Sequence, residues 1–238
     1  DFERDFQYDP SGNQTEALYR NSDRSNLEWN EDDQLKRVVK NSQELNFTRY
    51  DAQGQKAVHL HRVVGLEETA YLGPNLTLRD GRYLTKHVFA GSERLASKVD
   101  PDWFNEPPVI QFHSDHLGST NYATNNDQFL IQHDEYYPSG ELWTDQTDSR
   151  YELARRFVFA GKEQDVHTGL IDFGARSYDA RQGQWLSPDP AFDGLNLYAY
   201  VHNNPVNLID PFGLTAEVTG EDSQVTWSNR TRDDNGVT

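Results

Sequence analysis

Two aspartate-proline pairs near the end of the chain are the residues whose types and spacing could support catalysis. Asp189-Pro190 and Asp210-Pro211 lie 21 residues apart, with a Leu/Tyr-rich segment between them. If turns bring the two carboxylates together, one ionised and one protonated group form an acid/base pair. Asp-Pro is also typical of an ordinary turn, because Asp accepts hydrogen bonds from the backbone that follows it and Pro presets the backbone dihedral.

Other polar side chains near these pairs are candidates for the same site. Asp193 is a third candidate carboxylate, and the sequence alone does not rank it against Asp189. Arg176 and Arg181 could steady a carboxylate or a developing oxyanion. An exposed arginine on a strand is the commoner case, because surface ion pairs contribute little to stability.

His113, Asp115 and His116 form a cluster of residue types that can ligate metals. In a strand, the first two point to one face and His116 points to the other, and nothing nearby supplies a fourth ligand. We therefore predict a hydrogen-bonded strand and turn here, with no metal. The sequence also contains no nucleotide-binding loop, no serine nucleophile elbow and no cysteine motif, so we expect no cofactor.

The composition restricts the partners and the location of the protein. The 238 residues include 22 basic and 39 acidic side chains, giving a formal charge of -17, which disfavours nucleic acid and anionic membranes as ligands. The absence of cysteine excludes disulfides. No apolar run approaches the length of a membrane span, and the chain starts without methionine or a signal peptide, so we expect a piece of a longer protein.

An internal repeat organises the first part of the chain. Aromatic residues recur every 21 positions, at Tyr8-Asp9, Trp29-Asn30, Tyr50-Asp51 and Tyr71-Leu72. Polar and apolar residues alternate between these points, which predicts antiparallel hairpins bounded by turns. One hairpin cannot bury its apolar face alone, so neighbouring hairpins must form a continuous sheet, with the aromatic side chains packed on it. We therefore predict an all-β fold.

The sequence near the end of the chain resembles the end of the core domain of Rhs proteins, the polymorphic-toxin family that includes the C subunits of Tc toxins. A further match, FHSDHLGST at 112–120, and the aromatic repeat, which resembles the YD repeats of this family, extend the likeness upstream. The matching blocks near the end are 176–180 (RSYDA), 183–190 (GQWLSPDP), 196–200 (NLYAY), 203–205 (NNP) and 210–214 (DPFGL).

The resemblance implies a fold and three regions. YD-repeat hairpins in this family form a spiralling sheet that is wound into a hollow shell. Residues 1–175 would be a fragment of that shell, and residues 176–214 would be the end of the core with its autocleavage motif. Residues 215–238 would be a stub at the start of the hypervariable C-terminal region, whose toxin activity cannot be read from this segment.

The resemblance also implies a reaction, since the family's core cuts its own chain after the Asp-Pro-x-Gly-Leu motif. Asp189 and Asp210 match the aspartates of the two Asp-Pro motifs, and the predicted scissile bond joins Leu214 to Thr215. The enzyme would be a single-turnover, aspartic-type self-cleaving protease. His202 is a supporting candidate, at a position where many relatives have Arg; position 184 is Gln where the family usually has Arg.

The expected partners follow from the same resemblance. They are the remainder of the Rhs shell, a C-terminal toxin domain, and an immunity protein or a secretion or delivery component, for a protein secreted or delivered from a bacterial cell. Two alternatives stay open: a non-catalytic, teneurin-like YD-repeat surface or adhesion protein, and a carbohydrate-binding β module, suggested by 12 Tyr and 5 Trp.

Overall fold

The computed structural model describes residues 6–18, 24–63, 65–91, 93–100, 109–148, 151, 156–192 and 194–218. Asp193 and residues 219–238, most of the predicted stub, lie outside these ranges. The described residues form antiparallel strands and short 3₁₀ turns, without an α-helix, which confirms the predicted all-β fold. None of the helical segments described has the length and apolar character needed to cross a membrane.

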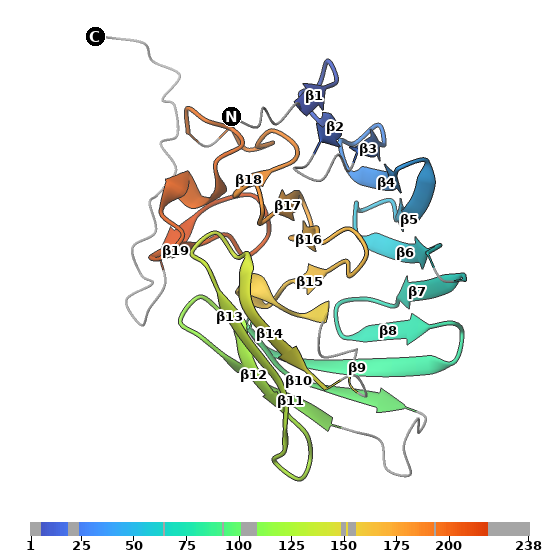
Figure 1. The fold of residues 1–238 in the computed structure, drawn as a ribbon, viewed down its shortest axis with the longest axis vertical. Helices are drawn as coiled ribbons and strands as arrows, with labels where there is room; N and C mark the ends of the chain where they lie inside the picture. The colour runs from blue at the N-terminus through green and yellow to red at the C-terminus, as the bar shows by residue number, and fades with distance from the viewer. Residues whose placement is uncertain are drawn as a thin grey trace.

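Fourteen strands form one antiparallel sheet in which each strand pairs with its neighbours in the sequence. Figure 1 shows that this sheet curves around the C-terminal part of the chain, and we call it the wall. Its strands are β1 (Phe6–Tyr8), β2 (Gln14–Leu18), β3 (Arg24–Trp29), β4 (Leu35–Lys40), β5 (Gln43–Tyr50), β6 (Lys56–His61), β7 (Glu67–Tyr71), β8 (Leu76–Arg79), β9 (Tyr83–Ala90), β10 (Glu93–Asp100), β11 (Val109–Ser114), β12 (Thr120–Thr124), β13 (Leu130–Tyr136) and β14 (Leu142–Thr147).

One type of turn recurs between the strands of the wall. After Tyr50, the carboxylate Oδ1 of Asp51 accepts hydrogen bonds from the backbone N–H groups of Gln53 and Gln55, each at 2.9 Å, and Gly54 has a φ of +75°. Asp suits this turn because its side chain satisfies nearby backbone donors, and Gly suits the positive φ. The same pair of bonds, to residues two and four positions on, is made by Asn30, Asp115 and Asn125.

The C-terminal segment, residues 156–218, lies inside the curve of the wall and contains two small sheets (Figure 1). A cluster of aromatic rings packs in this segment, many of them edge to face, which is the geometry that their quadrupoles favour. These rings are Phe159, Phe173, Tyr178, Trp185 and Tyr200. The strands are β15 (Glu163–Gln164), β16 (Ile171–Asp172), β17 (Ser177–Asp179) and β18 (Gln184–Trp185), and separately β19 (Leu208–Ile209) with β20 (Glu217–Val218).

Polar contacts join the wall to the C-terminal segment. Tyr71 donates its hydroxyl hydrogen to Glu163 at 2.7 Å, and the Lys56 ammonium lies 2.5 Å from Asp172. Because hydrogen bonds and ion pairs are directional, they fix the position of the C-terminal segment more strictly than an aliphatic contact would. The buried polar side chains on strands β5 to β13 are Asn46, Thr48, His59, His61, Thr69, Thr85, His87, Ser97, Thr120, Gln132 and Asp134.

Gly140 tests how closely the wall turns pack on the C-terminal segment. Its φ is +88°, and a Cβ added there would lie 2.6 Å from the ring of Phe159. We expect Gly140→Ala to lower the free energy of unfolding by roughly 2 kcal/mol or more, since overpacking adds to the left-handed strain. Gly81→Ala is the matched control, with a φ of +61° and open space around it. Gly81→Ala should lower the free energy of unfolding by about 1 kcal/mol in urea unfolding. Equal losses of stability in Gly81→Ala and Gly140→Ala would contradict the packing argument.

His87, on β9, should make stability depend on pH. Burial, followed by the nearby Arg94 guanidinium, lowers the pKa of His87 to about 3. Between that value and the ordinary pKa near 6.5, the unfolded chain binds a proton that the folded chain does not, so stability should fall as the pH falls. The contribution has a slope of at most about 1.4 kcal/mol per pH unit, which His87→Gln should remove in urea unfolding. His113→Gln, at an exposed strand position, is the control.

Candidate functional site

The structure brings Asp189 and Asp210 together around the side chain of Arg176. The Nη1 atom of Arg176 lies 3.5 Å from Asp189 Oδ2, and its Nη2 atom lies 3.2 Å from Asp210 Oδ2. All three residues are buried, with exposed fractions of 5, 5 and 3% for Arg176, Asp189 and Asp210. The two carboxylates therefore share one guanidinium away from bulk water. An ion pair of this kind is far less screened than one on the surface.

Two backbone carbonyls and an aromatic ring also contact the side chain of Arg176. Its Nε donates to the carbonyl oxygen of Gly213 at 2.6 Å, and its Nη1 lies 3.4 Å from the carbonyl oxygen of Leu197. The guanidinium carbon lies 4.2 Å from the centroid of the Trp185 ring, within the range of a cation–π contact. The planar guanidinium thus joins β18, the loop at Leu197 and the turn around Gly213.

Asp210 forms the turn that carries the predicted scissile bond. Its Oδ1 accepts hydrogen bonds from the backbone N–H groups of Phe212, Leu214 and Thr215, at 3.2, 2.9 and 3.3 Å. Gly213 has a φ of +73°, and a Cβ there would lie 3.0 Å from the backbone nitrogen of Arg176. The turn is therefore fixed, with the nitrogen of the Leu214–Thr215 bond next to the Asp210 carboxylate.

Asp189 is held by the same type of local contact. Its Oδ1 accepts a hydrogen bond from the backbone N–H of Ala191 at 2.8 Å, and its own N–H donates to the carbonyl oxygen of Leu197 at 3.0 Å. Each aspartate thus uses one carboxylate oxygen for its turn and the other for Arg176. Both Asp-Pro motifs thus form turns and both carboxylates contact Arg176, while their action as an acid/base pair stays a prediction.

The supporting candidates lie in different surroundings. The expectation of an exposed arginine was wrong for Arg176, which no local pattern marks as buried. It holds for Arg181, whose side chain is 40% exposed and binds Asp179 with Nε–Oδ1 at 2.9 Å. His202 is exposed in the 3₁₀ turn η4 (Tyr200–Asn203), and Asp193 lies outside the described residues.

The cluster around residue 115 has local bonding roles. Asp115 caps its turn through the N–H groups of Leu117 and Ser119, at 2.8 and 2.9 Å. His113 Nε2 lies 3.1 Å from Thr124 Oγ1, and His116 Nε2 donates to the carbonyl oxygen of Val206 at 2.9 Å. These contacts match the predicted strand and turn.

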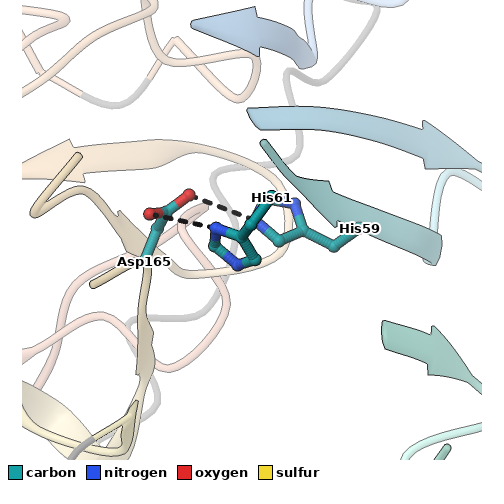
Figure 2. Close-up of side chains that lie close together, drawn as sticks. All are labelled: His59, His61 and Asp165. Atoms are coloured by element: carbon teal, nitrogen blue, oxygen red, sulfur yellow. Dashed lines mark hydrogen bonds and ion pairs between the residues drawn. The ribbon is translucent and has the colours of Figure 1, made fainter. Parts of the chain in front are cut away.

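A second buried polar cluster, which the sequence analysis missed, joins the wall to the C-terminal segment. His59 Nε2 lies 3.1 Å from Asp165 Oδ2, and His61 Nδ1 lies 3.9 Å from Asp165 Oδ1 (Figure 2). Burial lowers the pKa of His61 to about 3, so its ring is neutral at pH 7. Burial alone would raise the pKa of Asp165, but hydrogen bonds from His59 and Asn46 hold it well below its usual range.

Comparisons with known proteins agree with the fold. The family model for the teneurin YD-shell matches residues 109–206. The chain is 43% identical over 99 residues to toxin subunit YenC2 of Yersinia entomophaga. This alignment covers 40% of this chain and 10% of the relative. It is 26% identical over 221 residues to the tRNA3(Ser)-specific nuclease WapA of Bacillus spizizenii, covering 87% of this chain and 9% of that protein.

Solved structures show the same architecture. The crystal structure of TcdB2-TccC3 matches with a TM-score of 0.70 and 23% identity, covering 89% of this chain and 14% of that one. A TcdB2-TccC3-TEV structure matches with a TM-score of 0.69 and 25% identity, covering 89% of this chain and 13% of that one. The chain thus spans about a tenth of the length of the curated toxin subunits that it matches.

The curved sheet of hairpins places this chain in the class of YD-shell proteins. Within that class, the matches to the toxin subunits of Yersinia entomophaga support an Rhs/YD-repeat protein similar to the Tc-toxin C subunits, and the solved structures share its fold. The division into residues 1–175, 176–214 and 215–238 stays a prediction.

The buried ion-pair network predicts a large effect from removing its one arginine. Arg176→Met would leave two buried carboxylates without their counter-ion, and we expect the free energy of unfolding to fall by about 3–5 kcal/mol. The matched control is Arg37→Met, because Arg37 also joins two carboxylates, Glu28 at 3.0 Å and Glu44 at 2.6 Å, but its side chain is 37% exposed. This control should cost less than about 1 kcal/mol in urea unfolding, and similar losses for both variants would contradict the importance of the buried network.

Proposed function

We propose that this chain is part of an Rhs-type shell that encloses a C-terminal toxin segment and releases it by cutting its own chain between Leu214 and Thr215. The observation that supports cleavage most directly is the position of Asp210. Its Oδ1 lies 3.3 Å from the backbone nitrogen of Thr215, while its Oδ2 is paired with Arg176. Leu214 is 39% exposed, which gives water access to the bond.

The proposed reaction uses one proton held between the two aspartates. Ionised Asp189 takes a proton from water as the water oxygen bonds to the carbonyl carbon of Leu214. Protonated Asp210 gives its proton to the Thr215 nitrogen as the carbon–nitrogen bond breaks, leaving a carboxylate at Leu214 and an amine at Thr215. Arg176 offsets the negative charge that develops on the oxyanion.

The scissile bond belongs to the same chain as the two aspartates, so a site of few residues is sufficient for one cleavage. The scissile bond follows a turn fixed by Asp210 and Gly213, so the protein does not have to bind it from solution. One turnover per chain completes the task. The proposal also includes supporting roles for Arg181 and His202 and a role for Asp193. Arg181 binds Asp179, and His202 is exposed.

The container part of the proposal is supported by the curvature of the wall and by the relatives. The wall bends around the C-terminal segment (Figure 1), as expected for a piece of a larger hollow shell. The partners would be the rest of the shell, a toxin domain after Leu214, and a delivery component or immunity protein. The chain would be secreted or delivered from a bacterial cell.

The second candidate is a non-catalytic shell like that of a teneurin-type surface protein. It is favoured by the match of the teneurin YD-shell model to residues 109–206, which include Asp189 but not Asp210. Such a protein would keep the wall and would leave the Leu214–Thr215 bond intact.

Cleavage can be tested with the chain carrying a folded reporter domain after Thr238. We expect the wild type to separate into two pieces on a denaturing gel, with mass spectrometry placing the new ends at Leu214 and Thr215. Asp189→Asn and Asp210→Asn should each slow this separation by roughly 100-fold or more, because each removes a proton-transfer group.

The matched control is Asp127→Asn, which changes an exposed carboxylate in the turn between β12 and β13. It should cut like the wild type. An uncut wild type would favour the teneurin-like alternative. Cutting at the same rate in both aspartate variants would point to a contaminating protease and would remove the catalytic roles.

A further inference from the structure

We propose that His59, His61 and Asp165 bind one divalent transition-metal ion, with Zn²⁺ the best fit, which clips the wall to the C-terminal segment. The three side chains come from two parts of the chain that are 106 residues apart at their nearest contact. His59 and His61 lie two positions apart on β6, so both point from the same face of the strand. Asp165 follows β15 and faces both rings (Figure 2).

The distances suit a common ion. The ligating atoms of the three side chains all lie within 4.8 Å of one another. Asp165 contributes one carboxylate oxygen 3.1 Å from His59 Nε2 and the other 3.9 Å from His61 Nδ1. Zinc–ligand bonds of about 2.0–2.1 Å in a tetrahedron separate ligand atoms by roughly 3.3–3.4 Å, so the site needs only small side-chain shifts.

His61 supplies an independent reason to place an ion here. His61 is 2% exposed, and its Nδ1 atom has no hydrogen-bond partner. Buried polar atoms without a partner are rare and costly, and each calls for an explanation. A metal ion between His61 Nδ1 and Asp165 would satisfy this nitrogen, and the neutral imidazole has the lone pair that this bond requires.

Further contacts orient the ligands in the way that metal sites require. His59 Nδ1 lies 2.7 Å from the hydroxyl oxygen of Thr48, a contact that fixes the ring with Nε2 directed at the Asp165 carboxylate. Asp165 Oδ1 accepts hydrogen bonds from the backbone N–H groups of His167 and Thr168, at 2.8 and 3.0 Å. Asn46 also donates to the carboxylate through Nδ2.

The cavity beside the cluster has room for a fourth ligand and a suitable charge. Its volume is about 40 Å³, enough for a water molecule. The charged residues that line it are the acids Glu163, Asp165 and Asp172 and the bases Lys56 and Arg156. Lys56 is engaged by Asp172 at 2.5 Å, and Arg156 by Glu67 at 3.5 Å. Among these lining residues the acids outnumber the bases by one, and a cation would offset that excess of negative charge.

Zinc binding is tested on the untagged chain after removal of metals with a chelator. After Zn²⁺ is added back, we expect one zinc ion per chain to stay bound through gel filtration. The melting temperature should rise by about 5 °C or more with excess Zn²⁺, because the ion binds only the folded state. Co²⁺ should give the intense visible absorption of a tetrahedral site. A wild type that retains no zinc would overturn the proposal.

His61→Leu is the decisive variant because it removes the unpartnered nitrogen and should still fold. It should lose the bound zinc, the thermal shift and the Co²⁺ spectrum. Asp165→Asn, which preserves the shape of the side chain, should lose the spectrum as well. The matched control is His113→Leu, at an exposed position on β11, which should bind as the wild type does. If His61→Leu binds normally, or if His113→Leu is the variant that loses the ion, binding is at the surface and the proposal is wrong.

Discussion

The C-terminal segment depends on the burial of one guanidinium between two carboxylates. Asp189 and Asp210 are only 5 and 3% exposed, and Arg176 supplies the counter-ion beside them, because an unpaired charge is expensive in the interior. Arginine suits this position because it stays charged and offers several donors in one plane. It can therefore hold two acids and the Gly213 carbonyl at the same time.

The turn at Asp210 repeats the geometry of the turns in the wall. Asp51 caps the backbone nitrogens two and four positions on, with glycine between them at positive φ, and Asp210 does the same with Gly213. The difference is Arg176, which occupies the second carboxylate oxygen of Asp210. A structural element of the repeat thus becomes a candidate reaction site through one buried side chain.

Local chemistry explains which parts of the structure were predictable. The 21-residue spacing, the alternation of polar and apolar residues and the Asp/Asn-Gly turns each act over a few residues, so the all-β hairpin fold followed from them. The burial of Arg176 could not be predicted in this way, because it depends on partners 13 and 34 positions away. His59 and Asp165 are 106 positions apart, and no pattern in the sequence connects them. Asp189 and Asp210 were paired by motif resemblance, whereas their shared partner required the structure.

The polar contacts between the wall and the C-terminal segment affect how genes of this kind can be recombined. Lys56 with Asp172, His59 with Asp165 and Tyr71 with Glu163 each join strand β6 or β7 of the wall to the C-terminal segment. A crossover between related genes anywhere from residue 72 to residue 162 would separate all three pairs at once. In each hybrid, the charges and donors of the wall would come from one parent and their partners in the C-terminal segment from the other. The wall and the C-terminal segment should therefore be inherited together.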